Sequence, residues 1–171
     1  MKFVVISDVH GRADLVDRIM LIHGDRDGAL FLGDGTKDIW VEQLQRGGRL
    51  FAGVRGNCDS IFAKAQEYDY DEELLLNIGE YTVIMMHGHT HSVKSGIERA
   101  VAYGAGRGAD ILLYGHTHVP CEIYYPEGSE AFGVRLTKPL WVMNPGSVAA
   151  GSYGLLQIRN GSVLLSHGTV K

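Results

Sequence analysis

Polar residues, most of them histidines, stand directly after the apolar runs of this chain, and this placement limits the fold more than any other sequence feature. Six of the eight histidines lie in turns that follow predicted strands, namely His10, His87, His89, His91, His116 and His118. Asp8, Asp34 and Asn57 follow the first three predicted strands in the same way. In open α/β sheets, ligands bind outside the carboxyl ends of the parallel strands. If these strands share one sheet, the polar turns meet at one edge and can form one site.

The first part of the chain alternates strands with helices. Short runs rich in β-branched and aromatic residues are each followed by apolar residues at helical spacing. The successive strand and helix pairs are residues 2–6 and 15–20, residues 29–32 and 39–44, and residues 50–53 and 61–65. Strands that alternate with helices predict βαβ units and a parallel sheet.

The second part of the chain is predicted to be richer in strands. Residues 74–78 and 81–86 are separated only by Gly79 and Glu80, which indicates a β-hairpin. A helix is expected over residues 93–104, and the remaining strands are residues 111–114, 122–125, 131–136, 141–143, 154–158 and 162–166. We expect this C-terminal part to be largely antiparallel. The acidic stretch at residues 69–73 is interpreted as a solvated edge.

Composition limits the class of protein. The chain has 171 residues, 45% of them hydrophobic, and a formal net charge of −4, which together predict one domain over residues 1–171. We recognise neither a membrane span nor a secretory leader, and therefore expect a cytoplasmic protein with no membrane partner. The acidic balance argues against long nucleic acid as a ligand. Cys58 and Cys121 match no metal-knuckle spacing and are expected to be reduced thiols.

The spacing of the polar residues has a physical reason. Asp8 and His10 are two positions apart, so their side chains emerge on the same side of an extended turn and can reach one cation together. The same spacing recurs at His116 and His118. A glycine precedes both Asp34 and His116, and it allows the backbone to turn sharply at the strand end.

Each motif alone also has a purely structural interpretation. Asp8, Asp34 and Asp59 could each cap a helix. Asn57 could be an ordinary turn residue after glycine, and the last two histidines could lie on a hairpin surface. The occurrence of such residues at five separate strand ends favours a metal site over these alternatives.

With these motifs, the sequence resembles the calcineurin-like metallophosphoesterase superfamily, and within it the small bacterial and archaeal phosphodiesterase branch. The motifs that carry the resemblance are Asp8-Val9-His10, Gly33-Asp34, Gly56-Asn57-Cys58-Asp59, His87-Gly88-His89, Gly115-His116-Thr117-His118 and Asn144-Pro145-Gly146-Ser147. The resemblance implies an α/β fold, a sandwich of two β-sheets flanked by helices in four layers. It also implies two metal ions at the strand ends.

The resemblance further implies which residues hold the metals. Asp8, His10 and His118 correspond to ligands of the first ion, and Asn57, His87 and His116 to ligands of the second. Asp34 corresponds to the carboxylate that bridges the two ions. The nitrogen and oxygen donors suit divalent transition metals, with manganese as the first expectation and nickel, iron, zinc or cobalt as alternatives.

The expected reaction is hydrolysis of a small phosphodiester by a hydroxide that bridges the two ions. Asn57 and His89 are the candidates for catalytic contact with the phosphate. Arg12 is a further candidate for binding the anion, since it stands at the start of the first helix.

Cys58 is a departure from many members of the superfamily, which have a histidine at this position. A thiol is a poorer acid near neutral pH than an imidazole, so phenol-like leaving groups are favoured unless His89 takes over as general acid. Asp59 is assigned to orienting a ligand histidine. His91 could line the substrate entrance, but a surface histidine is the preferred interpretation.

Two other functions are considered beside the phosphodiesterase. One is a non-catalytic, protein-binding scaffold with the same fold, and the other is a phosphomonoesterase. Filled ligand positions argue against the scaffold, and the absence of a basic stretch argues against a nuclease. Four aromatic residues of the second part could be core or could form a homo-oligomer interface, namely Tyr124, Tyr125, Phe132 and Trp141. Asn144, Gly146 and Ser147 are expected to shape the turn beside the site.

Overall fold

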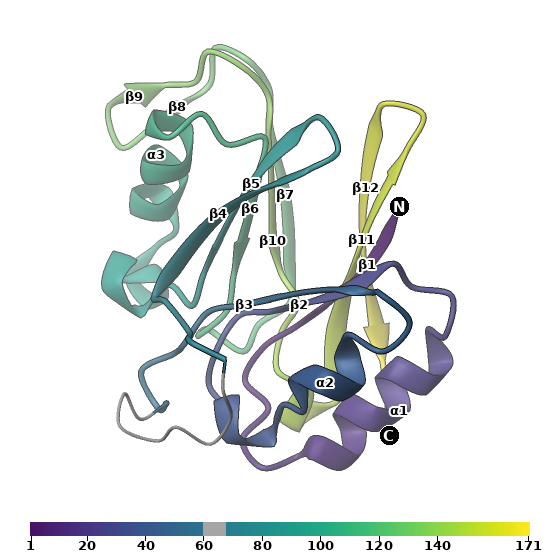
Figure 1. Ribbon diagram of the computed structural model, residues 1–171. Helices are drawn as coiled ribbons and strands as arrows, with labels where there is room; N and C mark the ends of the chain where they lie inside the picture. Colours follow the sequence, from purple (N-terminus) through teal and green to yellow (C-terminus); the bar gives the residue numbers. More distant parts are fainter. Residues whose placement is uncertain (60–67) are drawn as a thin grey trace.

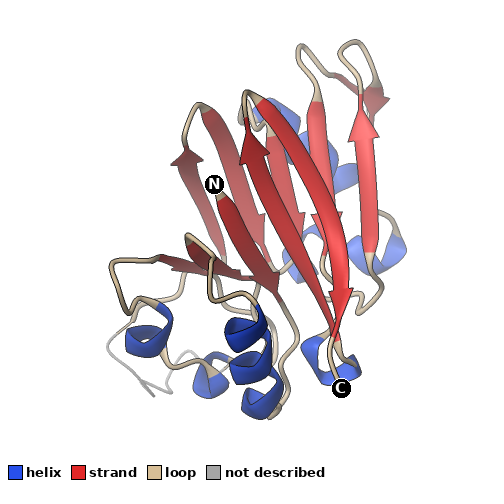
Figure 2. Cartoon of the chain, turned by 90° about the vertical axis from the view of Figure 1, so that its right-hand side faces the viewer, coloured by secondary structure: helices blue, strands red, loops and turns tan. Residues whose placement is uncertain are grey.

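Two five-stranded β-sheets pack face to face, and helices cover their outer faces (Figure 1). The computed structural model describes residues 1–59 and 68–171. Turned by 90°, the molecule shows helices at the lower end of the strands and a more distant helix behind them (Figure 2). This arrangement confirms the predicted α/β sandwich of four layers.

The first sheet has the strand order β12-β11-β1-β2-β3. Its parallel strands are β1 (Lys2–Ile6), β2 (Gly28–Phe31) and β3 (Leu50–Gly53), and its antiparallel strands are β11 (Ser152–Arg159) and β12 (Ser162–Thr169). The outer face is covered by α1 (Ala13–Ile22) and α2 (Val41–Leu44), and the short turn η1 (Thr36–Asp38) lies between β2 and α2. Strand β1 is apolar on both faces because both are covered: Val5 faces the second sheet and Val4 faces the helices.

The second sheet has the strand order β4-β5-β6-β10-β7. The central strands β5 (Tyr81–Met86), β6 (Ile111–Tyr114) and β10 (Leu140–Asn144) are parallel, and the edge strands β4 (Glu73–Ile78) and β7 (Cys121–Tyr125) are antiparallel to them. Helix α3 (Glu98–Gly106) covers the outer face together with the hairpin of β8 (Glu130–Ala131) and β9 (Val134–Arg135). Three short 3-10 turns complete the described elements, namely η2 (His89–His91), η3 (Val93–Ser95) and η4 (Val148–Ala150).

Three apolar clusters fill the spaces between the four layers. The central cluster lies between the sheets and includes the fully buried Leu30 and Leu113. The second cluster lies between the first sheet and α1, around Ile19, and the third lies between the second sheet and α3, around Val101. Each parallel strand is thus packed on both sides, which fixes the positions of the loops at its carboxyl end.

Most predicted strands are confirmed, and two differences have local causes. Residues 131–136 do not form one strand, because Phe132 and Gly133 adopt positive φ angles and turn the chain between β8 and β9. The C-terminal part is largely antiparallel as expected, and the exception is β10, which pairs in parallel with β6. The helix expected over residues 93–104 begins only at Glu98, because Gly96 has a φ of 141° and separates it from η3.

Other expectations have mixed outcomes. The helix expected at residues 39–44 is limited to α2, and the one expected at residues 61–65 lies outside the described residues. The solvated interpretation of residues 69–73 is wrong for two glutamates, because Glu72 pairs with Arg55 and Glu73 pairs with His91.

The aromatic residues of the second part divide into two kinds. Tyr125 and Trp141 pack against apolar clusters, whereas Tyr124 and Phe132 are exposed. Homo-oligomer formation through them stays a prediction. Along the two described ranges, we find no helix with the length and apolar content that a bilayer crossing requires.

We expect Leu113→Ala to lower the free energy of unfolding by about 2–5 kcal/mol, because it leaves a cavity between the two sheets. Leu75→Ala is the matched control, since Leu75 on β4 is 49% exposed and its truncation leaves no cavity. Urea denaturation of both variants measures the difference. Equal losses of stability would contradict a core centred between the sheets.

Candidate metal centre

Five loops meet where the two sheets join, at the carboxyl ends of β1, β2, β3, β5 and β6. Backbone hydrogen bonds tie these loops together: the Asp8 amide donates to the Gly33 carbonyl at 2.9 Å, and the Gly115 amide donates to the His87 carbonyl at 3.1 Å. The loops carry the residues predicted from the sequence, namely Asp8, His10, Asp34, Asn57, His87, His89, His116 and His118. The expected convergence of polar turns is therefore present, although it involves two sheets and not one.

The backbone of this region is strained at the predicted ligands. Positive φ angles occur at five of them, namely Asp8 (55°), His10 (45°), Asp34 (59°), His116 (69°) and His118 (60°). A left-handed conformation is costly for residues other than glycine and persists where surrounding structure enforces it, commonly at functional sites. Strain at these positions points to a functional requirement for the directions of their side chains.

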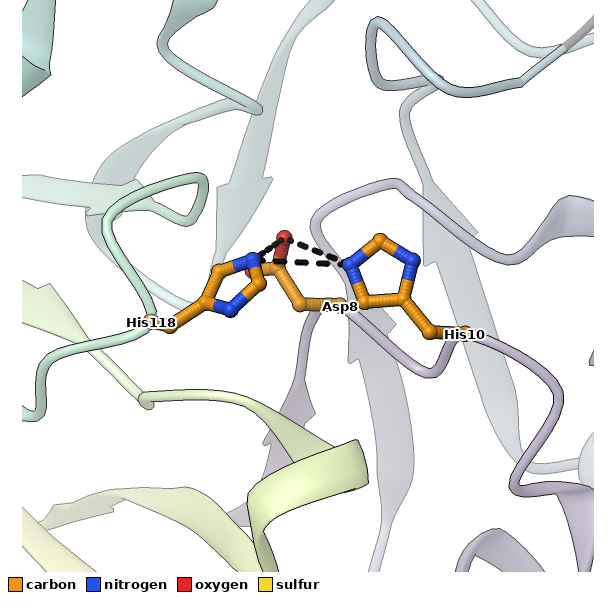
Figure 3. Close-up of side chains that lie close together, drawn as sticks. All are labelled: Asp8, His10 and His118. Atoms are coloured by element: carbon orange, nitrogen blue, oxygen red, sulfur yellow. Dashed lines mark hydrogen bonds and ion pairs between the residues drawn. The ribbon is translucent and has the colours of Figure 1, made fainter.

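Asp8, His10 and His118 form the first candidate group (Figure 3). The Oδ1 atom of Asp8 lies 3.1 Å from His118 Nε2 and 3.8 Å from His10 Nε2, and the two imidazole nitrogens are 3.4 Å apart. Asp8 is fully buried, and its Oδ2 accepts hydrogen bonds from the Ser7 hydroxyl and the His116 amide. Within the described part of the chain, its Oδ1 has no hydrogen-bond partner. A buried carboxylate oxygen left without a donor fits a cation held between it and the two imidazoles.

Asp34, His87 and His116 form the second candidate group. His87 Nε2 lies 3.3 Å from Asp34 Oδ2 and 3.1 Å from His116 Nδ1. The other ring nitrogen of His87 donates to the Leu32 carbonyl at 2.7 Å, which directs Nε2 toward the group. Metal-ligating histidines typically donate their second N–H in this way.

Asp34 connects the two groups. Its Oδ2 lies 4.0 Å from His10 Nε2 of the first group, in addition to its contact with His87 of the second. Burial opposes ionisation, but hydrogen bonds from His87 and from the Cys58 amide hold the pKa of Asp34 well below its ordinary value. The carboxylate is thus negative throughout the neutral range and can face two cations.

The pKa values of the two histidines in the second group are shifted in opposite directions. Burial disfavours the charged form of His87, yet the hydrogen bond to Asp34 and the charges of Asp8 and Asp34 raise its pKa. Burial, then the charge on His87, lowers the pKa of His116 to about 4. At neutral pH His116 therefore offers an unprotonated nitrogen to a metal ion.

Asp59 has a different role from the one predicted. It contacts no ligand histidine; its carboxylate accepts hydrogen bonds from the amides of Asp34, Gly35, Thr36 and Gly56, each between 2.8 and 2.9 Å. The predicted role is wrong because these main-chain donors saturate the carboxylate. Asp59 holds the turn that carries Asp34 against the turn that carries Asn57.

Two glycines permit the close contact of these turns. A Cβ atom on Gly56 would lie 2.1 Å from Asp34 Oδ1, and one on Gly115 would lie 2.0 Å from the Ser7 hydroxyl oxygen. Side chains at these positions would displace the carboxylates of both groups. The glycines of the predicted motifs therefore set the distance between loops, in addition to allowing sharp turns.

The three residues predicted to contact the substrate differ in their position relative to the two groups. Asn57 is exposed at the site and its amide donates to Cys58 Sγ at 3.3 Å. The His89 ring lies 5.5 Å from the His87 ring, and its buried Nδ1 has no partner within the residues described. Arg12 instead forms an exposed pair with Asp14 at 2.8 Å, and no described contact joins it to the two groups.

Cys58 lies among the candidate ligands, although its spacing from Cys121 in the sequence matches no metal-binding motif. It forms a third candidate group with His10 and Asp34, in which the ligand atoms lie within 4.8 Å of one another. Burial and the nearby Asp34 raise the pKa of its thiol. The thiol is thus protonated at neutral pH in the absence of a cation.

Supporting contacts explain other motif residues. The Asn144 amide donates to the Gly115 carbonyl at 2.8 Å, and the Ser147 hydroxyl donates to the Asp8 carbonyl at 2.9 Å, as expected for residues that shape the turn. Asp8 caps no helix, because α1 begins after Arg12 without a side-chain cap. Ser7 was missed by sequence reasoning; its only signal was its position beside Asp8.

Comparison with known proteins agrees with this geometry. The family described as the calcineurin-like phosphoesterase superfamily domain matches residues 1–169. A probable metallophosphoesterase of Bacillus subtilis (strain 168), YsnB, is 29% identical over 167 residues, which cover 94% of this chain and 86% of that protein.

Solved structures show the same fold. An archaeal phosphodiesterase superposes with a TM-score of 0.69 at 20% identity, covering 98% of this chain and 99% of its own. Vps29 of Entamoeba histolytica, determined in complex with Zn²⁺, superposes with a TM-score of 0.65 at 23% identity, covering 99% of each chain.

We expect Asp59→Asn to destabilise the protein by about 2–4 kcal/mol, because an amide oxygen cannot accept all of the bonds that the carboxylate accepts. Affinity for Mn²⁺ should fall as well, since the Asp34 turn loses its anchor. Urea denaturation and calorimetric titration measure the two effects. Asp38→Asn is the matched control, because Asp38 accepts one exposed amide bond from Gly11; similar results for both variants would count against the anchoring role.

His116 of the metal-free protein is expected to titrate at a pKa of about 4. This folded value lies below the ordinary value near 6.5, so the unfolded chain takes up the proton first as the pH falls. The stability associated with neutral His116 is therefore lost between pH 6.5 and 4. Imidazole NMR titration tests this directly, and a His116 pKa at or above 6.5 would refute it.

Proposed function

Because this chain belongs to the calcineurin-like phosphoesterase superfamily, we propose that it hydrolyses small phosphodiesters at a centre of two divalent metal ions. The observation that carries the proposal is the pair of ligand groups joined at Asp34, with the buried Oδ1 of Asp8 facing the first of them. Among the described residues this oxygen accepts no hydrogen bond, and a cation would satisfy it.

The proposed ligands follow the two groups. Asp8, His10 and His118 would hold one ion, and His87 and His116, with the amide oxygen of Asn57, would hold the other. Asp34 would contact both. The donation of the Asn57 amide nitrogen to Cys58 supports this assignment, because it leaves the amide oxygen free to face a cation.

When bound, two divalent ions supply a nucleophilic water of lowered pKa and offset the charge that develops on the phosphoryl oxygens. The residues of this chain orient the ester. Asn57 and His89 lie at the exposed side of the groups and are proposed to contact the phosphate. Burial lowers the pKa of His89, so it is mostly neutral near pH 7 and its N–H can donate a hydrogen bond to the ester.

The nature of the substrate follows from charge and from Cys58. A chain with net charge −4 is poorly suited to a long polyanion, which favours a small diester. The Cys58 thiol is a weak acid here, so esters with good leaving groups are the expected substrates.

Manganese is the first metal to test, because the groups consist mainly of imidazole and carboxylate donors. Arg12 would bind an anion only after its ion pair with Asp14 has opened.

A protein-binding scaffold is the second candidate function, and the likeness to Vps29 is the observation that favours it. The complete set of candidate ligands supports the enzyme instead. Catalytic turnover separates the two, since a scaffold has no need of metal-dependent hydrolysis.

The test compares bis-p-nitrophenyl phosphate with p-nitrophenyl phosphate, using metal-stripped protein with and without Mn²⁺. We expect metal-dependent cleavage of the diester at least 10-fold faster than of the monoester. Asp34→Ala should lower the rate by at least about 100-fold, because loss of a residue that supports a metal ligand already costs 10–100-fold.

Asp17→Ala, an exposed carboxylate on α1, is the control and should keep full activity. Absence of turnover with Mn²⁺, Ni²⁺, Co²⁺, Fe²⁺ and Zn²⁺ would exclude the hydrolase and favour the scaffold. Preference for the monoester would make the protein a phosphomonoesterase.

A further inference from the structure

The acidic segment before β4 runs between two loops of the candidate metal centre. Val54 at the end of β3 forms a bridge with Asp71, and the Arg55 amide donates to the Asp71 carbonyl at 2.8 Å. Two residues later, Glu73 pairs in register with Met86, the residue that precedes His87. Glu73 therefore stands at the sheet end beside the loop that carries His87 and His89.

The Glu73 carboxylate is part of a partly buried polar cluster. Its Oε1 lies 2.5 Å from His91 Nε2, and the side chains are 29% and 15% exposed. The Tyr103 hydroxyl of α3 also donates to Glu73, and the Tyr103 ring packs on the His91 ring with centroids 4.6 Å apart. Arg107 lies over the Tyr103 ring at 5.0 Å and completes the cluster. Glu73 and Tyr103 thus fix the imidazole of His91, and Arg107 supports the Tyr103 ring.

His91 and His89 are the two ends of one 3-10 turn, η2. The turn is bounded by left-handed residues, Gly88 with a φ of 100° and Ser92 with a φ of 55°. The His91 amide donates to the Gly88 carbonyl at 3.1 Å, and the Ser92 amide donates to the His89 carbonyl at 3.2 Å. In so short a turn, contacts that fix His91 also hold the backbone from which the His89 side chain projects.

His89 projects from this turn toward the candidate ligands. Its ring lies 5.5 Å from the His87 ring and 6.2 Å from the His116 ring. Among the described residues, no hydrogen bond holds its buried Nδ1. The ring is therefore oriented by the turn to which it is attached, and not by a partner of its own.

We propose that Glu73 is a positioning residue that acts through His91 to direct His89 at the leaving-group oxygen of the ester. The catalytic consequence rests on the phosphodiesterase function proposed above. A displacement of about 1 Å in a group that donates a hydrogen bond to the leaving-group oxygen can cost 100-fold in rate, so a cluster outside the metal groups can control the reaction.

The ion pair of Asp110 and Lys138 provides a comparison at the opposite end of the same sheet. Asp110 Oδ1 lies 2.7 Å from Lys138 Nζ, and its Oδ2 accepts the Thr82 amide at 2.8 Å. Like Glu73, Asp110 accepts two polar contacts at the end of a sheet. It lies beside Thr82, at the end of β5 opposite to His87. Asp110→Asn therefore reproduces the structural loss without the proposed effect on His89.

The experiment measures kcat and KM for bis-p-nitrophenyl phosphate and for diphenyl phosphate, whose phenol is the poorer leaving group. For Glu73→Ala we expect kcat to fall about 100-fold with diphenyl phosphate and less than about threefold with the nitrophenyl ester, with KM nearly constant. His91→Ala should give the same split, and the double variant should be no worse than either single one. Glu73→Gln retains an acceptor oxygen and should recover at least a third of the lost rate.

Equal losses on both esters, or the same split in Asp110→Asn, would overturn the proposal. Imidazole NMR spectra of the metal-free protein supply a readout that needs no activity. Glu73→Ala should shift the His89 ring resonances and leave those of His118 in place, whereas unchanged His89 resonances would also overturn the proposal. If the wild-type protein cleaves neither ester, the proposed function fails, and the NMR comparison still decides whether Glu73 positions His89.

Discussion

The structure depends on compensating the charge of two buried carboxylates, Asp8 and Asp34, at the joint between two sheets. Isolated charges in such a place are very costly, so the chain surrounds them with donors: a hydroxyl, main-chain amides and the imidazoles of three histidines. The loops can supply these donors only if they approach closely, which explains the glycines beside the carboxylates and the strained backbone at the ligands. Even so, one oxygen of Asp8 has no hydrogen bond among the described residues, and this residual deficit is what a cation would satisfy.

Sequence reasoning predicts much of this arrangement because its main signals are local. Unbroken apolar runs such as residues 2–6 indicate strands buried on both faces, and the polar residue after each run marks the end that carries chemistry. The differences have both local and long-range causes. A phenylalanine at positive φ turns the chain inside residues 131–136, where apolar residues alone indicate one strand. The pairing of β10 with β6 depends on contacts between distant parts of the chain, which periodicity does not record.

The supporting residues of the site were less predictable than the candidate ligands. Asp59 was expected to contact a histidine, but it binds four amides, and main-chain positions of this kind are fixed only by the fold. Glu73 looked like one charge in a solvated run, yet its register opposite Met86 places it beside the His87 loop. Ligand identity follows from residue type and spacing, whereas the role of a supporting carboxylate follows from which chain segment lies within 3 Å of it.

The first and second candidate metal groups each take their residues from both sheets. The first combines Asp8 and His10 of the β1 loop with His118 of the β6 loop, and the second combines Asp34 of the β2 loop with His87 and His116 of the β5 and β6 loops. A bound ion would therefore cross-link the two halves of the sandwich at one end, in addition to the apolar cluster between the sheets and hydrogen bonds such as that from His87 to the Leu32 carbonyl. Sliding of one sheet past the other would require ligand bonds to break, so metal content would govern the mechanical resistance of the sandwich to shear as well as its chemistry.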